Sequence, residues 1–202
     1  MATSRARAFG CGLVLLMTGA LEQGAALAGQ LAYPAIEVGY RIFNGPNQSS
    51  GGAGNLSGSN GYLFNFRAEQ RRGALRFNAA AQFEMASGSA GVSAPTASDS
   101  YQMYGASFLP GCYVYPFQEG RIQPFAGASA ILGWYTMNLN EAYTQSLSMG
   151  YEVSAGVDLR FRTGNALTYR IRSAYASHSA TVGGNAQGVS LSAFIFSLGI
   201  AY

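Results

Sequence analysis

Apolar and polar residues alternate along most of the chain beyond residue 34, and this alternation predicts β-strands. A strand places successive side chains on opposite faces, so positions i, i+2 and i+4 share one face. In the segment 74–86, Leu75, Phe77 and Phe83 fall on one face, whereas Arg76 and Glu84 fall on the other. We therefore predict strands that have one bulky apolar face and one face that carries the charge.

Clusters of Gly, Ser, Asn and Pro interrupt the alternation and divide it into eight predicted strands. These strands span 35–44, 61–70, 74–86, 101–117, 122–137, 148–161, 166–178 and 189–202. Short turns are expected at 71–73, 118–121 and 162–165, and longer loops at 45–60, 87–100, 138–147 and 179–188. Alternating short and long connections predict an all-β fold, namely an eight-stranded antiparallel up-and-down transmembrane β-barrel.

Strands 101–117 and 122–137 show a less regular alternation than the other six. Pro110 and Gly111 interrupt the first of them. Because proline lacks a backbone N–H and glycine weakens a strand, the pair predicts a bulge that exchanges the two faces. The inward and outward positions of these two strands therefore stay unassigned at the level of the sequence.

The composition favours a barrel that meets lipid over one that meets water. Only 10% of the 202 residues are charged, lysine is absent, and 13% are aromatic. Ordinary soluble domains carry about 25% charged residues. A soluble barrel or sandwich with the same alternation would need many more charges on its outer face. No apolar run after the leader reaches the length of a membrane-spanning helix. A closed β-barrel is the other structure in which every backbone N–H and C=O group in lipid is hydrogen-bonded.

The first 28 residues have the pattern of a secretory signal peptide. Arg5 and Arg7 precede a short apolar stretch, and Ala26-Leu27-Ala28 has the small residues of a cleavage site. We predict a signal peptide at 1–28 and the barrel domain at 29–202. Cys11 would leave with the leader, so Cys112 has no partner for an intrachain disulfide.

If the apolar faces meet lipid, the charged faces enclose the lumen. The predicted interior ion-pair network comprises Glu37, Arg41, Arg67, Glu69, Arg76, Glu84, Glu152, Asp158, Arg160, Arg170 and Arg172. Eight strands leave a lumen just wide enough for side chains to fill, and charges in that space must pair. The near balance of five acids and six bases favours a packed structural core. A small, porin-like pore remains the alternative.

The sequence predicts neither a metal site nor a cofactor. The long loops are rich in Gly, Ser and Asn and contain no calcium-loop spacing and no cluster of metal ligands. The net charge of +3 is too small to indicate nucleic-acid binding. The expected surroundings are outer-membrane lipids and lipopolysaccharide around a monomeric barrel in a Gram-negative outer membrane.

The last predicted strand ends on an aromatic residue, with apolar side chains at every second position. We interpret these five residues as the C-terminal insertion signal of an outer-membrane barrel: Phe194, Phe196, Leu198, Ile200 and Tyr202. Together with the segments 111–117 and 123–128 that flank a short turn, the chain resembles small outer-membrane proteins of the OmpA/OmpX type. The resemblance implies insertion by the barrel-assembly machinery, and it implies no single activity.

A second resemblance concerns the region around Ser177 and His178. The stretch 172–178 is similar to the C-terminal region of outer-membrane lipid A 3-O-deacylases, in which Ser177 takes the position of the catalytic serine. Tyr175 stands at the position of the catalytic histidine, and His178 stands at that of an asparagine. A serine without a base is a poor nucleophile. We therefore expect that the protein is not an enzyme. The alternative is a lipid A-modifying role that uses Ser177 and His178.

Overall fold

The structure, a computed structural model, describes residues 32–43, 60–90, 99–117, 119–139, 142–161, 167–182 and 187–201. The chain divides into two compact units, Met1–Ala32 and Tyr33–Tyr202, and the second forms a barrel. Residues 1–28, for which the sequence predicts a signal peptide, lie outside the described residues.

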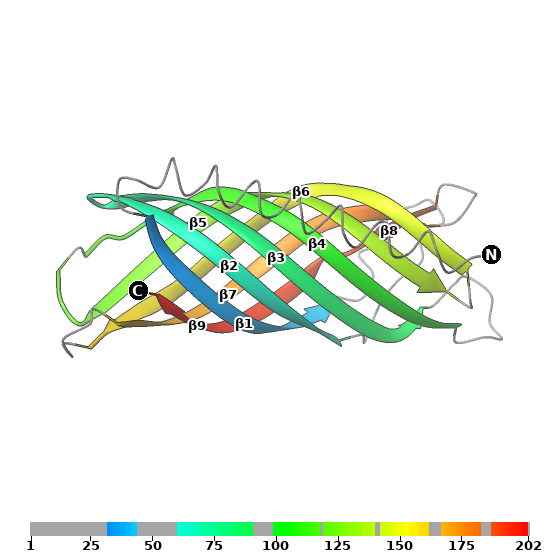
Figure 1. Ribbon diagram of the computed structural model, residues 1–202, viewed down its shortest axis with the longest axis horizontal. Coiled ribbons are helices and arrows are strands. Elements are labelled where there is room, and N and C mark those ends of the chain that lie inside the picture. The colour runs from blue at the N-terminus through cyan, green and yellow to red at the C-terminus, as the bar shows by residue number, and fades with distance from the viewer. Residues whose placement is uncertain are drawn as a thin grey trace, which may run out of the picture. The chain divides into compact units, whose positions relative to one another are not determined.

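Nine β-strand segments, coloured from blue to red in Figure 1, form one closed antiparallel sheet. They are β1 (Ala32–Phe43), β2 (Asn60–Arg72), β3 (Leu75–Ala90), β4 (Asp99–Val114), β5 (Ile122–Leu139), β6 (Ala142–Arg160), β7 (Thr168–Val182), β8 (Gln187–Ser190) and β9 (Ala193–Ala201). Neighbours in sequence are neighbours in the sheet. Pairing of β9 with β1 and β7, and of β7 with β6, closes the barrel.

The segments β8 and β9 together form the eighth strand of the barrel. Ser190 lies opposite Ser179 and Ala193 lies opposite Ala176, so the register on β7 is unchanged across the break at Leu191 and Ser192. The Leu191 amide donates a hydrogen bond to the His178 carbonyl at 2.8 Å inside this break. The predicted eight-stranded antiparallel barrel is therefore confirmed, although the prediction of an unbroken strand over 189–202 is wrong.

Three of the predicted long loops are shorter than the sequence indicated. Strand β5 reaches Leu139 and β6 begins at Ala142, so the predicted loop 138–147 lies mostly in a hairpin. Residues 87–90 and 99–100, and likewise 179–182 and 187–188, also belong to strands. Tyr143, Gln145 and Leu147 point outward and Ser146 and Ser148 inward, so small polar residues continue the alternation there. The predicted loop 45–60 falls outside the described residues, apart from Asn60.

The predicted bulge at Pro110 and Gly111 is absent from strand β4. Pro110 lies opposite Ala79 and Gly111 opposite Asn78, with no change of register along the β3–β4 pair. The β4–β5 ladder keeps one register but omits Leu109 and Pro110. Because proline has no N–H to donate, it interrupts the ladder on one side of the strand without rotating the faces. Met103, Ser107, Leu109 and Tyr113 consequently all face inward.

One short turn shows why the chain reverses where it does. Arg72 lies opposite Leu75, so only Gly73 and Ala74 connect β2 to β3. Gly73 has a φ of 62°, a left-handed conformation that glycine adopts without a steric penalty. Such two-residue turns match the twist of antiparallel strands. The prediction of a tight turn at 71–73 is correct to within one residue.

The barrel carries its apolar side chains on the outside and its charges on the inside. The outward rows include Phe64, Phe77, Phe108 and Leu198, and Leu198 is 61% exposed. The inward rows contain Glu37, with no exposed surface, and many other buried polar residues. This is the reverse of a water-soluble protein, in which large apolar side chains are buried and charges are exposed.

Candidate functional site: the lumen of the barrel

The structure places nearly all of the predicted interior charges inside the barrel. Ten have buried side chains: Glu37, Arg41, Arg67, Glu69, Arg76, Glu84, Glu152, Asp158, Arg170 and Arg172. Arg160, the eleventh, is only half-buried and lies at the end of β6, beside the short turns. The alternation of charge seen in the sequence thus corresponds to the inner face of the barrel wall.

Arg170 organises the charges near the short-turn end of the lumen. Its guanidinium donates to both carboxylate oxygens of Asp158, at 2.8 and 2.9 Å, and to the Tyr115 hydroxyl at 2.9 Å. It also forms a two-pronged ion pair with Glu69. The Tyr115 hydroxyl donates in turn to Asp158 at 2.9 Å. One cation therefore joins two carboxylates from separate strands, β2 and β6.

Arg76 extends the same group of residues toward β5. Its guanidinium lies 3.7 Å from Asp158, donates to the Gln123 amide oxygen at 3.1 Å, and stacks 3.4 Å above the Tyr115 ring centroid. A guanidinium over an aromatic face gains electrostatic attraction as well as packing. Tyr115 therefore supports both arginines.

Arg172 occupies the corresponding position one layer further along β7. It donates to Glu37 at 2.9 Å, to Glu152 at 2.5 Å and to the Ser197 hydroxyl at 3.2 Å. Arg67 forms an ion pair with Glu37 at 3.3 Å without hydrogen-bond geometry. Arg170 also approaches Glu37, at 3.6 Å. Glu37 therefore links the two arginine-centred groups, which together we call the inner network.

A separate group of polar residues lies toward the long-loop end, and we call it the outer cluster. Arg41 forms an ion pair with Glu84 and donates to the carbonyl of Leu191. The same guanidinium also contacts His178 Nε2, at 2.6 Å. Arg41 thus connects β1 to β3, to β7 and to the break between β8 and β9. The ring of Phe43 lies 4.7 Å from its charged carbon.

The contacts of His178 assign its tautomer. A guanidinium can only donate, so Nε2 must accept the bond from Arg41. Nδ1 then carries the hydrogen and donates it to the Ser148 hydroxyl at 2.8 Å. A histidine that activates serine must instead accept the serine proton. His178 is therefore a structural partner of Ser148 and is not positioned as its base.

An apolar layer lies between the outer cluster and the inner network. On β1, Gly39 separates Glu37 from Arg41, and a Cβ atom at Gly39 would meet Leu63. On β7, Ala174 and Ala176 lie between Arg172 and His178. The buried members of this layer are Leu63, Ala80, Leu109, Ile131, Ala174, Ala176 and Ile195. The layer separates the two sets of charges.

Further apolar residues close the long-loop side of the outer cluster. Phe43, Met103, Met137 and Leu191 are at most 3% exposed and form one cluster with Tyr135. The Tyr135 hydroxyl shares a 2.9 Å hydrogen bond with Ser107. Buried polar and apolar groups of side chains thus alternate along the described part of the lumen.

Ser177 and His178 do not form a dyad in this structure. Adjacent strand residues point to opposite faces, and His178 is buried in the lumen while Ser177 is only half-buried on the other face. The Ser177 hydroxyl lies 3.3 Å from that of Ser192. Tyr175, at the position of the deacylase base, packs against Phe194 with ring centroids 5.3 Å apart.

The last strand presents the apolar row that the sequence predicts as an insertion signal. Phe194, Phe196 and Leu198 are 48%, 54% and 61% exposed on the outside. Ile200 is half-buried, and Tyr202 falls outside the described residues. On the inner side, Ser197 hydrogen-bonds to Arg172 and Glu37, so a small residue leaves room for the arginine.

Sequence reasoning missed several lumen residues, chiefly Tyr113, Tyr115, Gln123, Tyr135 and Ser148. Tyr113, Tyr115, Gln123 and Tyr135 lie on or just beyond β4 and β5, whose faces were left unassigned. Ser148 is the first residue of the strand predicted over 148–161. The signal that could have identified the β4 residues is the alternation of faces. Met103, Ser107, Leu109 and Tyr113 all stand at odd-numbered positions, and Pro110 does not interrupt this alternation.

No group of three or more His, Cys, Asp or Glu side chains among the described residues is arranged to hold a metal ion. Within the same residues, no helix has the length and apolar character needed to cross a membrane.

Comparison with known proteins identifies a shared fold. No family model and no curated protein matches the chain. The crystal structure of Neisserial surface protein A (NspA) is 17% identical, with a TM-score of 0.54 over 84% of this chain and 95% of that one. The Yersinia pestis protein Ail matches with 13% identity and a TM-score of 0.45, over 85% and 100% of the two chains. The outer membrane enzyme PagL matches with 14% identity and a TM-score of 0.39, over 82% and 97%. The chain therefore has the fold of the small eight-stranded outer-membrane β-barrels.

Proposed function

We propose that the chain is an integral protein of a Gram-negative outer membrane, and that it has a structural or surface-exposed role with a closed lumen. The observation that carries the proposal is the reversed distribution of side chains. Exposed apolar rows, including Leu147 and Leu198, suit contact with lipid, and the buried charges suit a lumen shielded from it. The signal peptide predicted at 1–28 would direct the chain for export.

The polar interior is better suited to hold the barrel together than to conduct ions. Arg170 and Arg172 each form ion pairs with two or more carboxylates. An apolar layer separates the inner network from the outer cluster. A buried charge that has lost its partner is strongly destabilising, whereas paired charges join strands that are distant in sequence. We infer that the network fixes the shape of the barrel.

The proposed surroundings follow from this topology. Short turns facing the periplasm and longer connections facing outward are the usual arrangement of bacterial barrels. Lipid and lipopolysaccharide would surround a monomer, and the barrel-assembly machinery would insert it. The geometry of Ser177 and His178 lends no support to a lipid A-modifying activity, because their side chains lie on opposite sides of the wall.

Heat-modifiable gel mobility in outer-membrane fractions tests the proposal. A folded barrel resists detergent until it is boiled, so we expect unboiled and boiled samples to migrate differently. The protein should remain in the membrane fraction after washing with carbonate or urea. Recovery as a soluble periplasmic protein, with no change of mobility on boiling, would contradict the proposal.

A further inference from the structure

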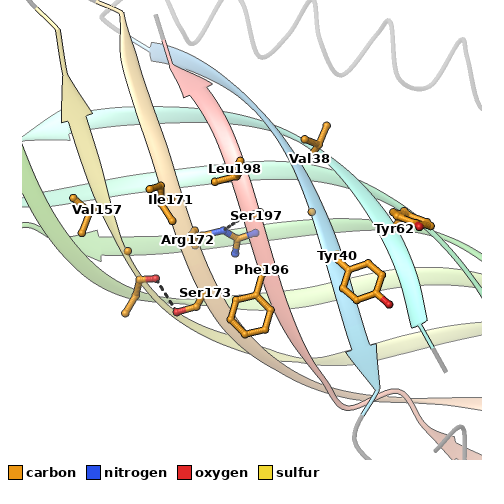
Figure 2. Close-up of a pocket in the computed structure, with 13 residues that line it drawn as sticks. Val38, Tyr40, Tyr62, Val157, Ile171, Arg172, Ser173, Phe196, Ser197 and Leu198 are labelled. Atoms are coloured by element: carbon orange, nitrogen blue, oxygen red, sulfur yellow. Dashed lines mark hydrogen bonds between the residues drawn. The ribbon is translucent and has the colours of Figure 1, made fainter. Parts of the chain in front are cut away.

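A groove crosses the outer surface of the barrel over five adjacent strands, β2, β1, β9, β7 and β6 (Figure 2). Its volume is about 540 Å³. One border is a row of branched aliphatic side chains: Val157, Ile171, Leu198 and Val38. The other border runs from Ala155 and Ser173 through Phe196 to Tyr40 and Tyr62. Figure 2 shows the labelled members of both rows on either side of Arg172 and Ser197.

The strand register produces these two rows. Ile171 lies opposite both Val157 and Leu198, and Phe196 lies opposite both Ser173 and Tyr40. The residues between the rows point into the lumen, so their backbone forms the floor. The rows are therefore built into the pairing of the wall and do not depend on a loop.

Two small residues make the groove deeper than an ordinary gap between rows. Ala155 and Ser173 lie opposite each other on β6 and β7, and both are exposed. The Ser173 hydroxyl donates to the Ala155 carbonyl at 3.4 Å, which directs its polar hydrogen to the wall. At this point the neighbouring Phe196 and Ile171 stand above the floor as side walls.

The groove runs from one end of the barrel toward the other. Val157 lies three residues from the short-turn end of β6, and Tyr62 lies two residues from the long-loop end of β2. Four steps between neighbouring strands span about 19 Å. One leaflet of the hydrocarbon core is about 15 Å thick, so an inclined groove of this length matches a single leaflet.

The two tyrosines distinguish the ends of the groove chemically. Tyr40 and Tyr62 meet edge to face with ring centroids 5.6 Å apart, and Tyr62 is 65% exposed. A tyrosine combines an apolar ring with a hydroxyl, and such residues lie where hydrocarbon gives way to polar head groups. The long-loop end is therefore suited to the polar part of a lipid, and the remainder to hydrocarbon.

We propose that this groove holds one fatty acyl chain of an outer-leaflet lipid, with its ester region beside Tyr40 and Tyr62. The inference rests on the proposed membrane location, and the groove is continuous with the apolar outer face of the transmembrane barrel. No water is expelled when lipid replaces lipid, so the preference comes from shape and van der Waals contact, together with hydrogen bonds from the tyrosine hydroxyls.

Filling the groove provides the test. Ala155→Leu combined with Ser173→Leu places two large side chains in the low part of its border, and both positions are exposed on the outer face, so folding should be retained. The matched control is Ala128→Leu with Ala130→Leu, because these alanines are exposed on the outer face of β5, away from the groove. Native mass spectrometry of barrels extracted in mild detergent measures the lipid that stays bound.

Wild-type and control barrels should retain one lipid, and the filled variant should retain about tenfold less. Equal retention in the filled variant, with a folded heat-modifiable barrel, overturns the acyl-chain proposal alone. A dimer that disappears when the groove is filled also overturns it, because a second copy of the chain would then be the occupant. Absence of the wild-type protein from the membrane fraction overturns the proposed function and this inference with it.

Discussion

The two polar regions of the lumen use arginine in different ways. In the inner network, Arg170 and Arg172 each contact several carboxylates, and Glu37 joins them. In the outer cluster, Arg41 pairs with one carboxylate, Glu84, and uses its remaining donors on a histidine and a backbone carbonyl. The first region is a network in which arginines share carboxylates, whereas the second depends on a single guanidinium.

The comparison indicates that the two ends of the barrel have separate stabilising roles. In the inner network Glu37 pairs with three arginines and Asp158 with two, whereas Glu69 and Glu152 each pair with one. Loss of Arg41 leaves Glu84 without its cation and the Leu191 carbonyl without its donor, at the point where the eighth strand is interrupted. The apolar layer that includes Leu63 and Ile195 separates the two regions. The inner network should therefore govern closure of the barrel, and the outer cluster should govern the long-loop end.

The largest effect is expected from Arg170→Met. The change leaves Glu69 and Asp158 buried without their main cation, and a broken buried pair costs about 3–5 kcal/mol. Urea unfolding in lipid vesicles measures the loss, with the fluorescence of Trp134, the one tryptophan, as the signal. The control is Arg121→Met, because Arg121 is exposed and should change stability by no more than about 0.5 kcal/mol. Equal losses in both variants would contradict a structural role for the network.

Arg41→Met should destabilise the barrel by about 3 kcal/mol, and a second change should largely reverse the loss. In Arg41→Met/Glu84→Leu no charge of the pair remains, and the site borders the apolar cluster of Phe43 and Met103. Replacement of a buried pair by apolar residues is often neutral, so the double variant should recover to within about 1.5 kcal/mol of wild type.

A double variant in the inner network should behave differently from the double variant in the outer cluster. Arg170→Met/Glu69→Leu still removes the hydrogen-bonded ion pair of Asp158 and leaves it only the 3.7 Å pair with Arg76, so stability should recover less. The same unfolding assay compares the two double variants. If both recover to the same extent, the distinction between a shared network and a single pair is wrong.

Double-mutant cycles test whether the apolar layer separates the two regions. Glu37→Gln and Glu84→Gln share no cation among the described contacts, so their effects should add to within about 0.5 kcal/mol. Glu37→Gln and Glu152→Gln both act on Arg172, so they should couple by about 0.5–3 kcal/mol. Strong coupling between Glu37 and Glu84 would mean that the layer does not insulate them.

The smallest effect is expected outside the lumen, from Ser177→Ala. Its hydroxyl contacts only Ser192 among the hydrogen bonds of the described residues, so stability should change by about 0.5 kcal/mol or less. Overexpression of the wild type should leave the acylation of lipid A unchanged, as measured by mass spectrometry. Loss of 3-O-acyl chains that depends on Ser177 would support the lipid A-modifying alternative instead.

The faces of the barrel wall were predictable because they depend on local alternation. Arg76, Glu84, Glu152 and Arg170 fall on the inner face simply because their apolar neighbours must face outward. The segment 142–147 was wrongly predicted as part of a loop, because serine and threonine residues are typical of loops. These residues are also compatible with a strand, at positions where the outer face does not need to be strongly apolar.

The partners inside the lumen were not predictable from the same alternation. Arg41 and Glu84 are 43 residues apart and lie on strands separated by β2, so their meeting depends on the tilt and stagger of the whole barrel. The interruption at Leu191 likewise depends on Arg41 from the opposite end of the chain. Such contacts are properties of the closed sheet, and no single segment encodes them.

Single-channel recording in planar lipid bilayers tests the central claim most directly, namely that side chains close the lumen. Refolded wild-type barrels should insert without stable conductance steps, because charged pairs and apolar layers fill the interior. Insertion can be verified in the same preparation by heat-modifiable mobility. Large and stable single-channel currents from the folded barrel would contradict the claim and establish the pore in its place.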